Sequence, residues 1–241
     1  MEMPFKQRQQ KLRKVLGPLL GKYPAPSREQ FLKMDVLDLV MWSAVSSDPF
    51  DPNVPRAFNR LTGDFVDWNE ARVSSTNELG ELLQACRLNP ERAVHIKNTA
   101  QLIFYKENRL SLDFLSTREP ADVKKYISSL KRFPETQANV IMILLSDAAD
   151  IPPIPSVDRF SRRVGFLLSD ATNNAIRLIY KKTLPQSQTY NAFYAICKHA
   201  QTLCKEKNPR CGACFLNKTC DYGVDKTDRK TRKSSSAARK K

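Results

Sequence analysis

Four cysteines stand close together towards the C-terminal end of the chain, in the stretch "CKEKNPRCGACFLNKTC". They are Cys204, Cys211, Cys214 and Cys220, with the spacing C-x6-C-x2-C-x5-C. Four thiolates in one short loop can close around a single metal centre. The N-terminal stretch does not resemble a secretion signal, so we expect an intracellular chain whose thiols are not paired as disulfides.

The cysteine spacing leaves two kinds of metal centre open. Structural zinc sites usually combine two short C-x2–4-C pairs, and only Cys211 and Cys214 form such a pair. Iron–sulfur clusters also take four thiolates and accept wider, uneven spacings. The two other cysteines, Cys86 and Cys197, lie on apolar helical faces and are expected in the core. His95 and His199 are expected to be surface or structural residues, not ligands.

Positive charge is concentrated at the two ends of the chain. The net charge is +15 over 241 residues. Residues 1–33 contain eight Lys or Arg and two acidic residues, and so do residues 225–241. Basic arms on a globular body suit nucleic acid, although the tail could equally be a solvated segment that maintains solubility. The Ser/Lys/Arg composition of residues 225–241 predicts disorder in either case.

The elements that must position the cysteines are expected to be helices. Only seven glycines occur, β-branched alternation is nearly absent, and apolar residues recur at helical spacing, as in Val123, Tyr126, Ile127 and Leu130. Helix starts are predicted at Asn89-Pro90 and near Ser75, Ser156 and Ser187. The sequence thus predicts an all-α protein of roughly nine or ten helices. No apolar run is long enough to cross a membrane, so no membrane partner is expected.

The segment "KNPRCGACFLNKTCDYG" resembles, almost position by position, the [4Fe–4S] loop of the endonuclease III family of DNA glycosylases. Three upstream segments extend the likeness to about residues 30–223: residues 82–104, which precede the family's hairpin, residues 130–144 at the helix-hairpin-helix motif, and residues 154–165 around its catalytic aspartate. The resemblance implies a structural [4Fe–4S] cluster. It also implies that the loop grips the backbone of double-stranded DNA through Lys205, Lys207, Arg210 and Lys218.

The same resemblance implies two helical lobes with a cleft between them. A continuous helical lobe would span residues 34–148 and end near a degenerate hairpin at 130–139. A discontinuous cluster lobe would combine residues 1–33 with 149–224, and a basic tail would follow at 225–241. We expect a monomer located in the cytoplasm and nucleoid, or in the nucleus.

The hairpin departs from the family pattern, which is approximately L-P-G-V-G-x-K-T-A. Here the register is "LKRFPETQA", from Leu130 to Ala138, so both glycines are absent and Thr136 replaces the lysine. Threonine cannot form a Schiff base, which predicts that strand cleavage by a lyase step is absent. Lys131 is five residues too early to replace that amine, but Lys131 and Arg132 could contact phosphate through their side chains.

Asp158 occupies the position of the family's catalytic carboxylate. In the hydrolytic members this group stabilises positive charge on the sugar as the base departs and helps to activate water. The plainer alternative is a first-turn carboxylate that only favours the helix dipole. At the position of a family glutamine that fills the gap left by a flipped base, the sequence has Val45, which could act as an apolar wedge or as a core residue.

These observations favour a monofunctional DNA glycosylase that flips a damaged or mismatched base and hydrolyses its N-glycosidic bond. A non-catalytic DNA-binding relative with the same scaffold and cluster is the alternative. A zinc-containing DNA-binding protein unrelated to repair is a third reading of the cysteines.

Overall fold

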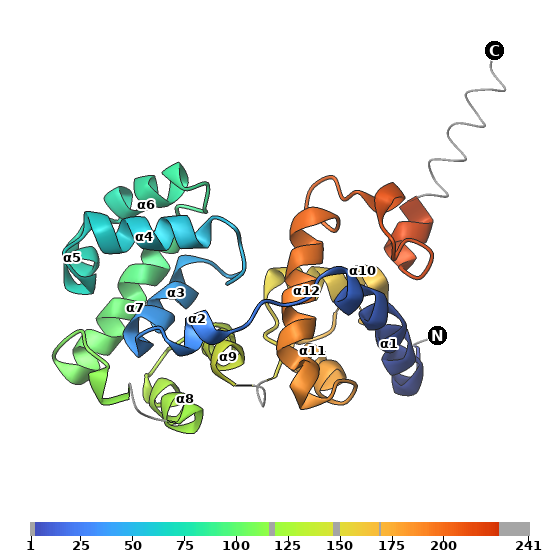
Figure 1. Ribbon diagram of the computed structural model, residues 1–241, viewed down its shortest axis with the longest axis horizontal. Helices are drawn as coiled ribbons and strands as arrows, with labels where there is room; N and C mark the ends of the chain where they lie inside the picture. Colours follow the sequence, from blue (N-terminus) through green and yellow to red (C-terminus); the bar gives the residue numbers. More distant parts are fainter. Residues whose placement is uncertain (1–2, 116–118, 147–149, 169, 227–241) are drawn as a thin grey trace, which may run out of the picture. The chain divides into compact units, whose positions relative to one another are not determined.

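The computed structural model describes residues 3–115, 119–146, 150–168 and 170–226. Within these ranges the chain forms the helices α1–α12, a further helical stretch at residues 221–226 and three short 3-10 helices, with no strand (Figure 1). The predicted all-α class is therefore confirmed, with more helices than the nine or ten expected. None of the described helices is long and apolar enough to span a membrane.

The chain separates into two compact units. Met1–Pro26 and Pro153–Lys241 form one, which we call the cysteine unit, and Ser27–Pro152 form the other, the hairpin unit. The boundaries predicted from the sequence fall after residues 33 and 148, and that domain assignment stays a prediction. Of the basic tail expected at 225–241, residues 227–241 lie outside the described residues, whereas residues 221–226 are helical.

The hairpin unit is built around α3 (Val36–Val45), which is apolar on nearly every side and almost wholly buried. Packing on all sides is what such a helix requires, and α7 (Arg92–Glu107), α9 (Glu135–Leu145) and α4 (Val54–Asp64) contact it. The remaining elements are α2 (Glu29–Leu32), α5 (Trp68–Val73), α6 (Thr76–Ala85), the 3-10 helix η1 (Asp113–Leu115) and α8 (Pro120–Ser129).

Side-chain caps fix where several of these helices begin. The hydroxyl of Ser75 accepts the Glu78 N–H at 3.1 Å, so α6 starts where the sequence predicted. The Asp35 carboxylate caps α3 by accepting the Leu37 N–H at 2.8 Å. At Asn89-Pro90 the prediction was early, because Asn89 accepts the Glu91 N–H in a separate turn and α7 begins only at Arg92.

In the cysteine unit, α12 (Thr189–Thr202) packs against both α1 (Phe5–Lys22) and α10 (Pro155–Val164). The other elements are α11 (Asn173–Lys181) and the 3-10 helices η2 (Gln186–Gln188) and η3 (Cys211–Ala213). The starts predicted near Ser156 and Ser187 are close to those observed, at Pro155 and Thr189. Because α12 is covered on two sides, much of its surface lies in the core.

Gly165 ends α10 in the left-handed region, with φ 91°. A Cβ at this residue would lie 1.8 Å from Oδ2 of Asp221, whose carboxylate forms an ion pair with Lys11 of α1. The glycine therefore lets α10 stop where α1 and the C-terminal segment meet.

We expect Gly165→Ala to lower the stability of the cysteine unit by about 1–2 kcal/mol, because alanine pays the left-handed backbone cost and displaces Asp221. Gly17→Ala is the matched control: Gly17 lies inside α1 with open space around it, so the same change should raise stability by about 1 kcal/mol. Urea denaturation of both variants measures the two shifts. Equal effects of the same sign would contradict the assignment of strain to Gly165.

Candidate functional site

The four cysteines of the C-terminal loop line one small cavity of about 20 Å³ in the cysteine unit. Each is partly buried and none is in a disulfide. The cavity walls come from α10 and α12 as well as from the loop, through Phe160, Val164 and His199 among others. The structure thus brings together the four side chains that the sequence predicted as ligands.

The chemistry of this donor set fits a bound metal centre. Burial raises the pKa of Cys220 to about 11 and raises the pKa of Cys214, and the other thiols add to both increases. Four thiolates so close together need a cation to balance their charge. In the part of the chain that the structure describes, no three His, Cys, Asp or Glu side chains stand at metal-binding distances, so the cavity rather than a coordination geometry supports the assignment.

Arg163 of α10 ties the loop to the helices beneath it. Its guanidinium donates to the carbonyl oxygens of Lys205 at 2.6 Å and Glu206 at 3.0 Å, and lies 3.5 Å from Sγ of Cys204. Sγ of Cys220 lies 3.1 Å from the Arg163 carbonyl oxygen, to which only the protonated thiol can donate. A guanidinium beside the sulfurs also supplies positive charge where thiolates must form.

His199 of α12 lies against the cysteine cavity, a position that its sequence context does not predict. The sequence placed it in a charged stretch, yet its side chain is only 2% exposed, because α1 and α10 cover α12 on both sides. Its Nε2 is 3.7 Å from Sγ of Cys214. Burial lowers the pKa of His199 to about 4, so the imidazole is neutral at pH 7. His95, by contrast, is exposed as expected.

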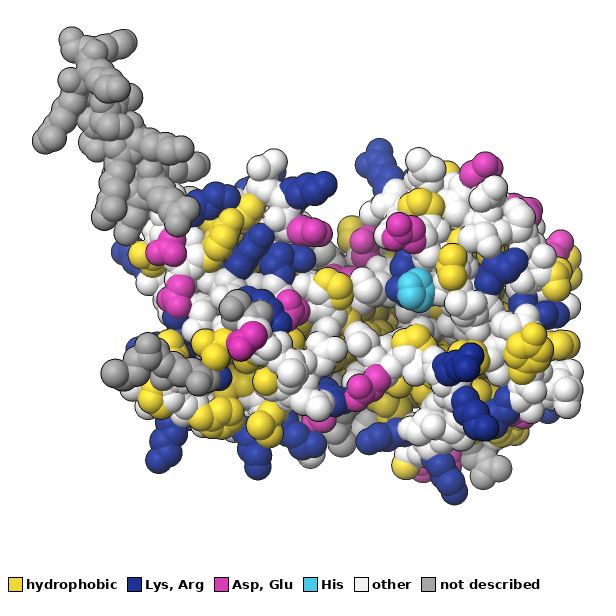
Figure 2. Space-filling model, turned by 180° about the vertical axis from the view of Figure 1, so that it is seen from behind, with side chains coloured by type: hydrophobic (Ala, Val, Ile, Leu, Met, Phe, Trp, Pro, Cys, Tyr) yellow, Lys and Arg dark blue, Asp and Glu magenta, His cyan; other side chains and the backbone are white. Residues whose placement is uncertain are grey.

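The four cations predicted to contact DNA from the loop are all exposed. They are Lys205, Lys207, Arg210 and Lys218. Figure 2 shows that Lys and Arg side chains also protrude over other parts of the face seen there. Exposure leaves the loop cations available to a polyanion, while Arg163 holds the backbone at Lys205 and Glu206.

In the hairpin unit, α8 and α9 pack against each other and are joined by residues 130–134, a helix-hairpin-helix arrangement. The Phe133 N–H donates to the Leu130 carbonyl at 3.1 Å, and Arg132 adopts φ 67°. Arg132 stands where the family pattern has its first glycine, so a left-handed residue occurs at this position without a glycine. Lys131 and Arg132 are both exposed, and Thr136 is half-buried in the first turn of α9.

Asp158 lies in the first turn of α10 with about a third of its side chain exposed. Nε of Arg162 donates to both carboxylate oxygens, at 2.8 and 2.9 Å. Nη2 of Arg162 also donates to the Ala171 carbonyl at 2.8 Å, and its Nη1 donates to the Leu168 carbonyl. Arg162 therefore anchors the carboxylate to the loop after α10. The i, i+4 spacing of the pair was a sequence signal that could have identified this partner.

Val45 is fully buried at the end of α3. Of the two roles predicted for it, the structure therefore supports a core residue and not an exposed wedge. The end of α3 is fixed by Arg92, whose guanidinium donates to the Ala44 carbonyl at 2.8 Å and the Ser43 carbonyl at 3.2 Å. Burial lowers the pKa of Arg92 to about 10, and the helix carbonyls offset the cost of burying its charge. Val45 thus presents no surface to DNA in this conformation.

Sequence comparison gives distant relatives only. No protein-family model matches the chain. DEMETER of Arabidopsis thaliana, named as a transcriptional activator, is 19% identical over 198 residues, covering 75% of this chain and 10% of DEMETER. A second protein of that plant, described by its name as a candidate DNA glycosylase, is 23% identical over 167 residues, covering 69% of this chain and 57% of that protein. The chain therefore spans from about a tenth to just over half the length of these relatives.

Solved structures match over nearly the whole chain. Two complexes of endonuclease III with DNA, one a trapped covalent intermediate, superpose with TM-scores of 0.67 and 0.68 at 18% identity, covering 91% of this chain and 98% of theirs. A thermostable thymine-DNA glycosylase superposes with a TM-score of 0.55 at 12% identity. The predicted resemblance is confirmed: this chain has the endonuclease III-like fold of helix-hairpin-helix DNA glycosylases.

Glycine at the hairpin turn should stabilise the hairpin unit. Arg132→Gly removes a left-handed cost of about 1–2 kcal/mol and adds an unfolded-state entropy cost of about 0.4–1 kcal/mol. We expect a net gain of about 0.5–1 kcal/mol in urea denaturation. Lys131→Gly, one residue earlier and without a positive φ, should give no gain. A gain from Lys131→Gly equal to that from Arg132→Gly would contradict this account.

Loss of one cavity thiol should expose the loop to proteolysis. We expect trypsin to cut Cys214→Ser after Lys205, Lys207 or Arg210 much faster than it cuts the wild type, because a loop without its metal centre is no longer held closed. Cys197→Ser is the matched control, since Cys197 is buried in α12 and does not line the cavity. Equal cleavage rates in all three proteins would contradict a metal-dependent loop.

Proposed function

We propose that this protein is a DNA glycosylase that removes a damaged or mismatched base from double-stranded DNA by hydrolysis. The observation that carries the proposal is Asp158, a partly exposed carboxylate held in a fixed orientation in the first turn of α10. The endonuclease III-like fold supplies the context. Two complexes of that fold contain DNA, and one relative is named as a candidate DNA glycosylase.

In the proposed reaction, water attacks the anomeric carbon of the flipped nucleotide as the bond from that carbon to the base nitrogen breaks. The Asp158 carboxylate stabilises the positive charge that develops on the sugar and accepts the proton of the attacking water. The departing base leaves with the bonding electron pair and takes up a proton from solvent. Arg162 keeps both carboxylate oxygens in place, which limits the reorganisation needed at the moment of reaction.

The product is an abasic site in an uncut strand. A lyase step needs an amine that forms a Schiff base with the opened sugar, and Thr136 offers only a hydroxyl in the place of the family lysine. We assign Thr136 no covalent role. The nearest cations, Lys131 and Arg132, lie in the hairpin turn before α9 and are proposed to contact phosphate.

DNA binding is proposed to use exposed cations in each unit. Lys205, Lys207, Arg210 and Lys218 would contact the phosphate backbone from the loop, and Lys131 with Arg132 from the hairpin. Flipping a base costs a few kcal/mol and least at a mispair, which gives one source of selectivity. Because the contacts are to phosphate, binding should weaken steeply as salt rises.

We propose a [4Fe–4S] cluster as the occupant of the cysteine cavity, held by Cys204, Cys211, Cys214 and Cys220. When bound, the cluster would offset part of the negative charge of the four thiolates and hold the loop closed, and we assign it no chemistry in base removal. In this proposal the cysteines hold the loop closed, and the loop cations contact the DNA backbone.

A non-catalytic DNA-binding protein on the same scaffold is the second candidate. It is favoured by the engagement of Arg162 with both oxygens of Asp158, since a carboxylate neutralised by a guanidinium stabilises a cationic sugar less well. The missing hairpin lysine and glycines point the same way.

Single-turnover assays on duplexes with a panel of mismatches and lesions separate the two candidates. Each reaction is divided and one half is treated with hot alkali, which cleaves abasic sites. We expect strand breaks only after alkali, and a fall of roughly 10²-fold or more in rate for Asp158→Asn, because the proton acceptor is lost. Asp170→Asn, a change at an exposed carboxylate in the same unit, is the control and should retain the wild-type rate.

Other outcomes have definite meanings. Breaks without alkali would contradict the hydrolytic mechanism and make Lys131 the first amine to test. Tight DNA binding with no base release on any duplex would establish the non-catalytic candidate. An unchanged rate in Asp158→Asn would remove Asp158 from the mechanism.

A further inference from the structure

We propose that His199 is a positioning residue of the cysteine site, whose Nε2–H donates a hydrogen bond to Sγ of Cys214 and so holds the metal centre in place. The inference rests on the metal site of the proposed function and goes beyond it, because no ligand role is assigned to His199. The contact is Nε2 to Sγ at 3.7 Å, inside the range of hydrogen bonds to sulfur.

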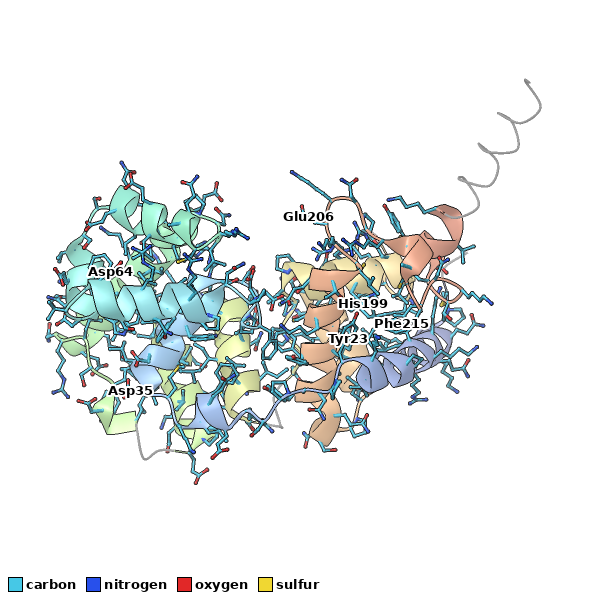
Figure 3. All side chains as sticks on the ribbon, turned by 45° about the horizontal axis from the view of Figure 1, so that its top comes forward. Tyr23, Asp35, Asp64, His199, Glu206 and Phe215 are labelled. Carbon is cyan, nitrogen blue, oxygen red and sulfur yellow. The ribbon has the colours of Figure 1, made fainter. Side chains whose placement is uncertain are left out.

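Three aromatic rings fix the orientation of the imidazole. Tyr23 at the end of α1, Phe160 of α10 and Phe215 of the cysteine loop meet it edge to face, with ring centroids 6.0, 5.8 and 5.5 Å away. Figure 3 shows Tyr23, His199 and Phe215 gathered in the cysteine unit. An imidazole packed in this way cannot rotate freely, so the atom that faces Cys214 is determined by the fold.

The unpartnered nitrogen identifies which tautomer is present. Nδ1 of His199 is buried and has no hydrogen-bonding partner within the described part of the chain. A proton on Nδ1 would leave a buried N–H unsatisfied and would turn the Nε2 lone pair towards sulfur. A proton on Nε2 faces the sulfur instead and leaves only a lone pair without a donor, which is the less costly arrangement.

Metal binding makes this preference stronger. A cysteine that binds a metal is a thiolate, which accepts hydrogen bonds and cannot donate one. With Nε2 facing the sulfur, the imidazole therefore suits a thiolate at Cys214 only as an Nε2–H donor. Hydrogen bonds to ligand atoms from side chains outside the ligand set orient the ligands, and their loss typically costs 10–100-fold in metal affinity or activity.

The rate of metal loss tests the proposal, whichever metal the purified protein contains. Iron and zinc are measured in anaerobically purified protein and then followed over time in air with a chelator. We expect His199→Phe, which keeps a ring but has no donor, to lose metal roughly 10-fold faster or more. His199→Gln restores a side-chain N–H and should lie close to the wild type. Phe166→Leu, a change at a buried ring of the same unit that is not one of the three rings around His199, is the matched control and should lose metal at the wild-type rate.

A second measurement does not depend on how well the variants fold. Nitrogen-15 NMR of the wild-type imidazole should find the proton of His199 on Nε2, and a proton on Nδ1 would overturn the proposal. Equal metal loss from His199→Phe and wild type would also overturn it, as would loss from His199→Gln as fast as from His199→Phe. Wild-type protein that neither contains nor takes up metal would end the proposal, while base release in the Asp158 assays would still be read independently.

Discussion

Four cysteine side chains share one small cavity, and the negative charge of their thiolates is the constraint on which the cysteine unit depends. Burial and mutual repulsion oppose ionisation of Cys214 and Cys220, so the loop can close over thiolates only with a cation inside. Two neighbouring helices supply groups that stabilise negative charge on the sulfurs. Arg163 of α10 adds a guanidinium beside Cys204, and His199 of α12 adds a donor beside Cys214. The contacts at the sulfurs therefore hold the loop, with its exposed cations, on α10 and α12.

Two positions outside the cysteine cavity, Arg132 and Asp158, combine a geometry expected from the family pattern with an unexpected charged group. Arg132 adopts the left-handed conformation of a glycine but brings a long cation to the hairpin turn. Asp158 keeps its place in the first turn of α10 but is bound by Arg162, four residues later. In both cases an arginine supplies the charge, through Arg132 in the hairpin turn and Arg162 beside the carboxylate. In the proposed function, the hairpin contacts phosphate through side chains and not through backbone N–H groups. Arg162 orients the Asp158 carboxylate but also partly neutralises it.

Sequence patterns predicted those features that depend on local spacing. The cysteine spacing predicted one shared site, Ser75 and Glu78 predicted a helix start, and the position of Asp158 predicted a first-turn carboxylate. Features that depend on packing between helices could not be predicted from these patterns. The sequence left His199 as a surface or structural residue and Val45 as a wedge or a core residue, because the burial of α12 and of the end of α3 is a tertiary property. The conformation of Arg132 could not be predicted, since arginine rarely adopts positive φ.

If the four cysteines hold an iron–sulfur cluster that closes the loop, the purified protein must contain both iron and sulfide. Iron, acid-labile sulfide and zinc are therefore measured in anaerobically purified wild-type protein. We expect about four iron and four sulfide per chain with no stoichiometric zinc, as a [4Fe–4S] cluster requires. One zinc per chain without sulfide would contradict the cluster and revive the zinc alternative that the cysteine spacing left open.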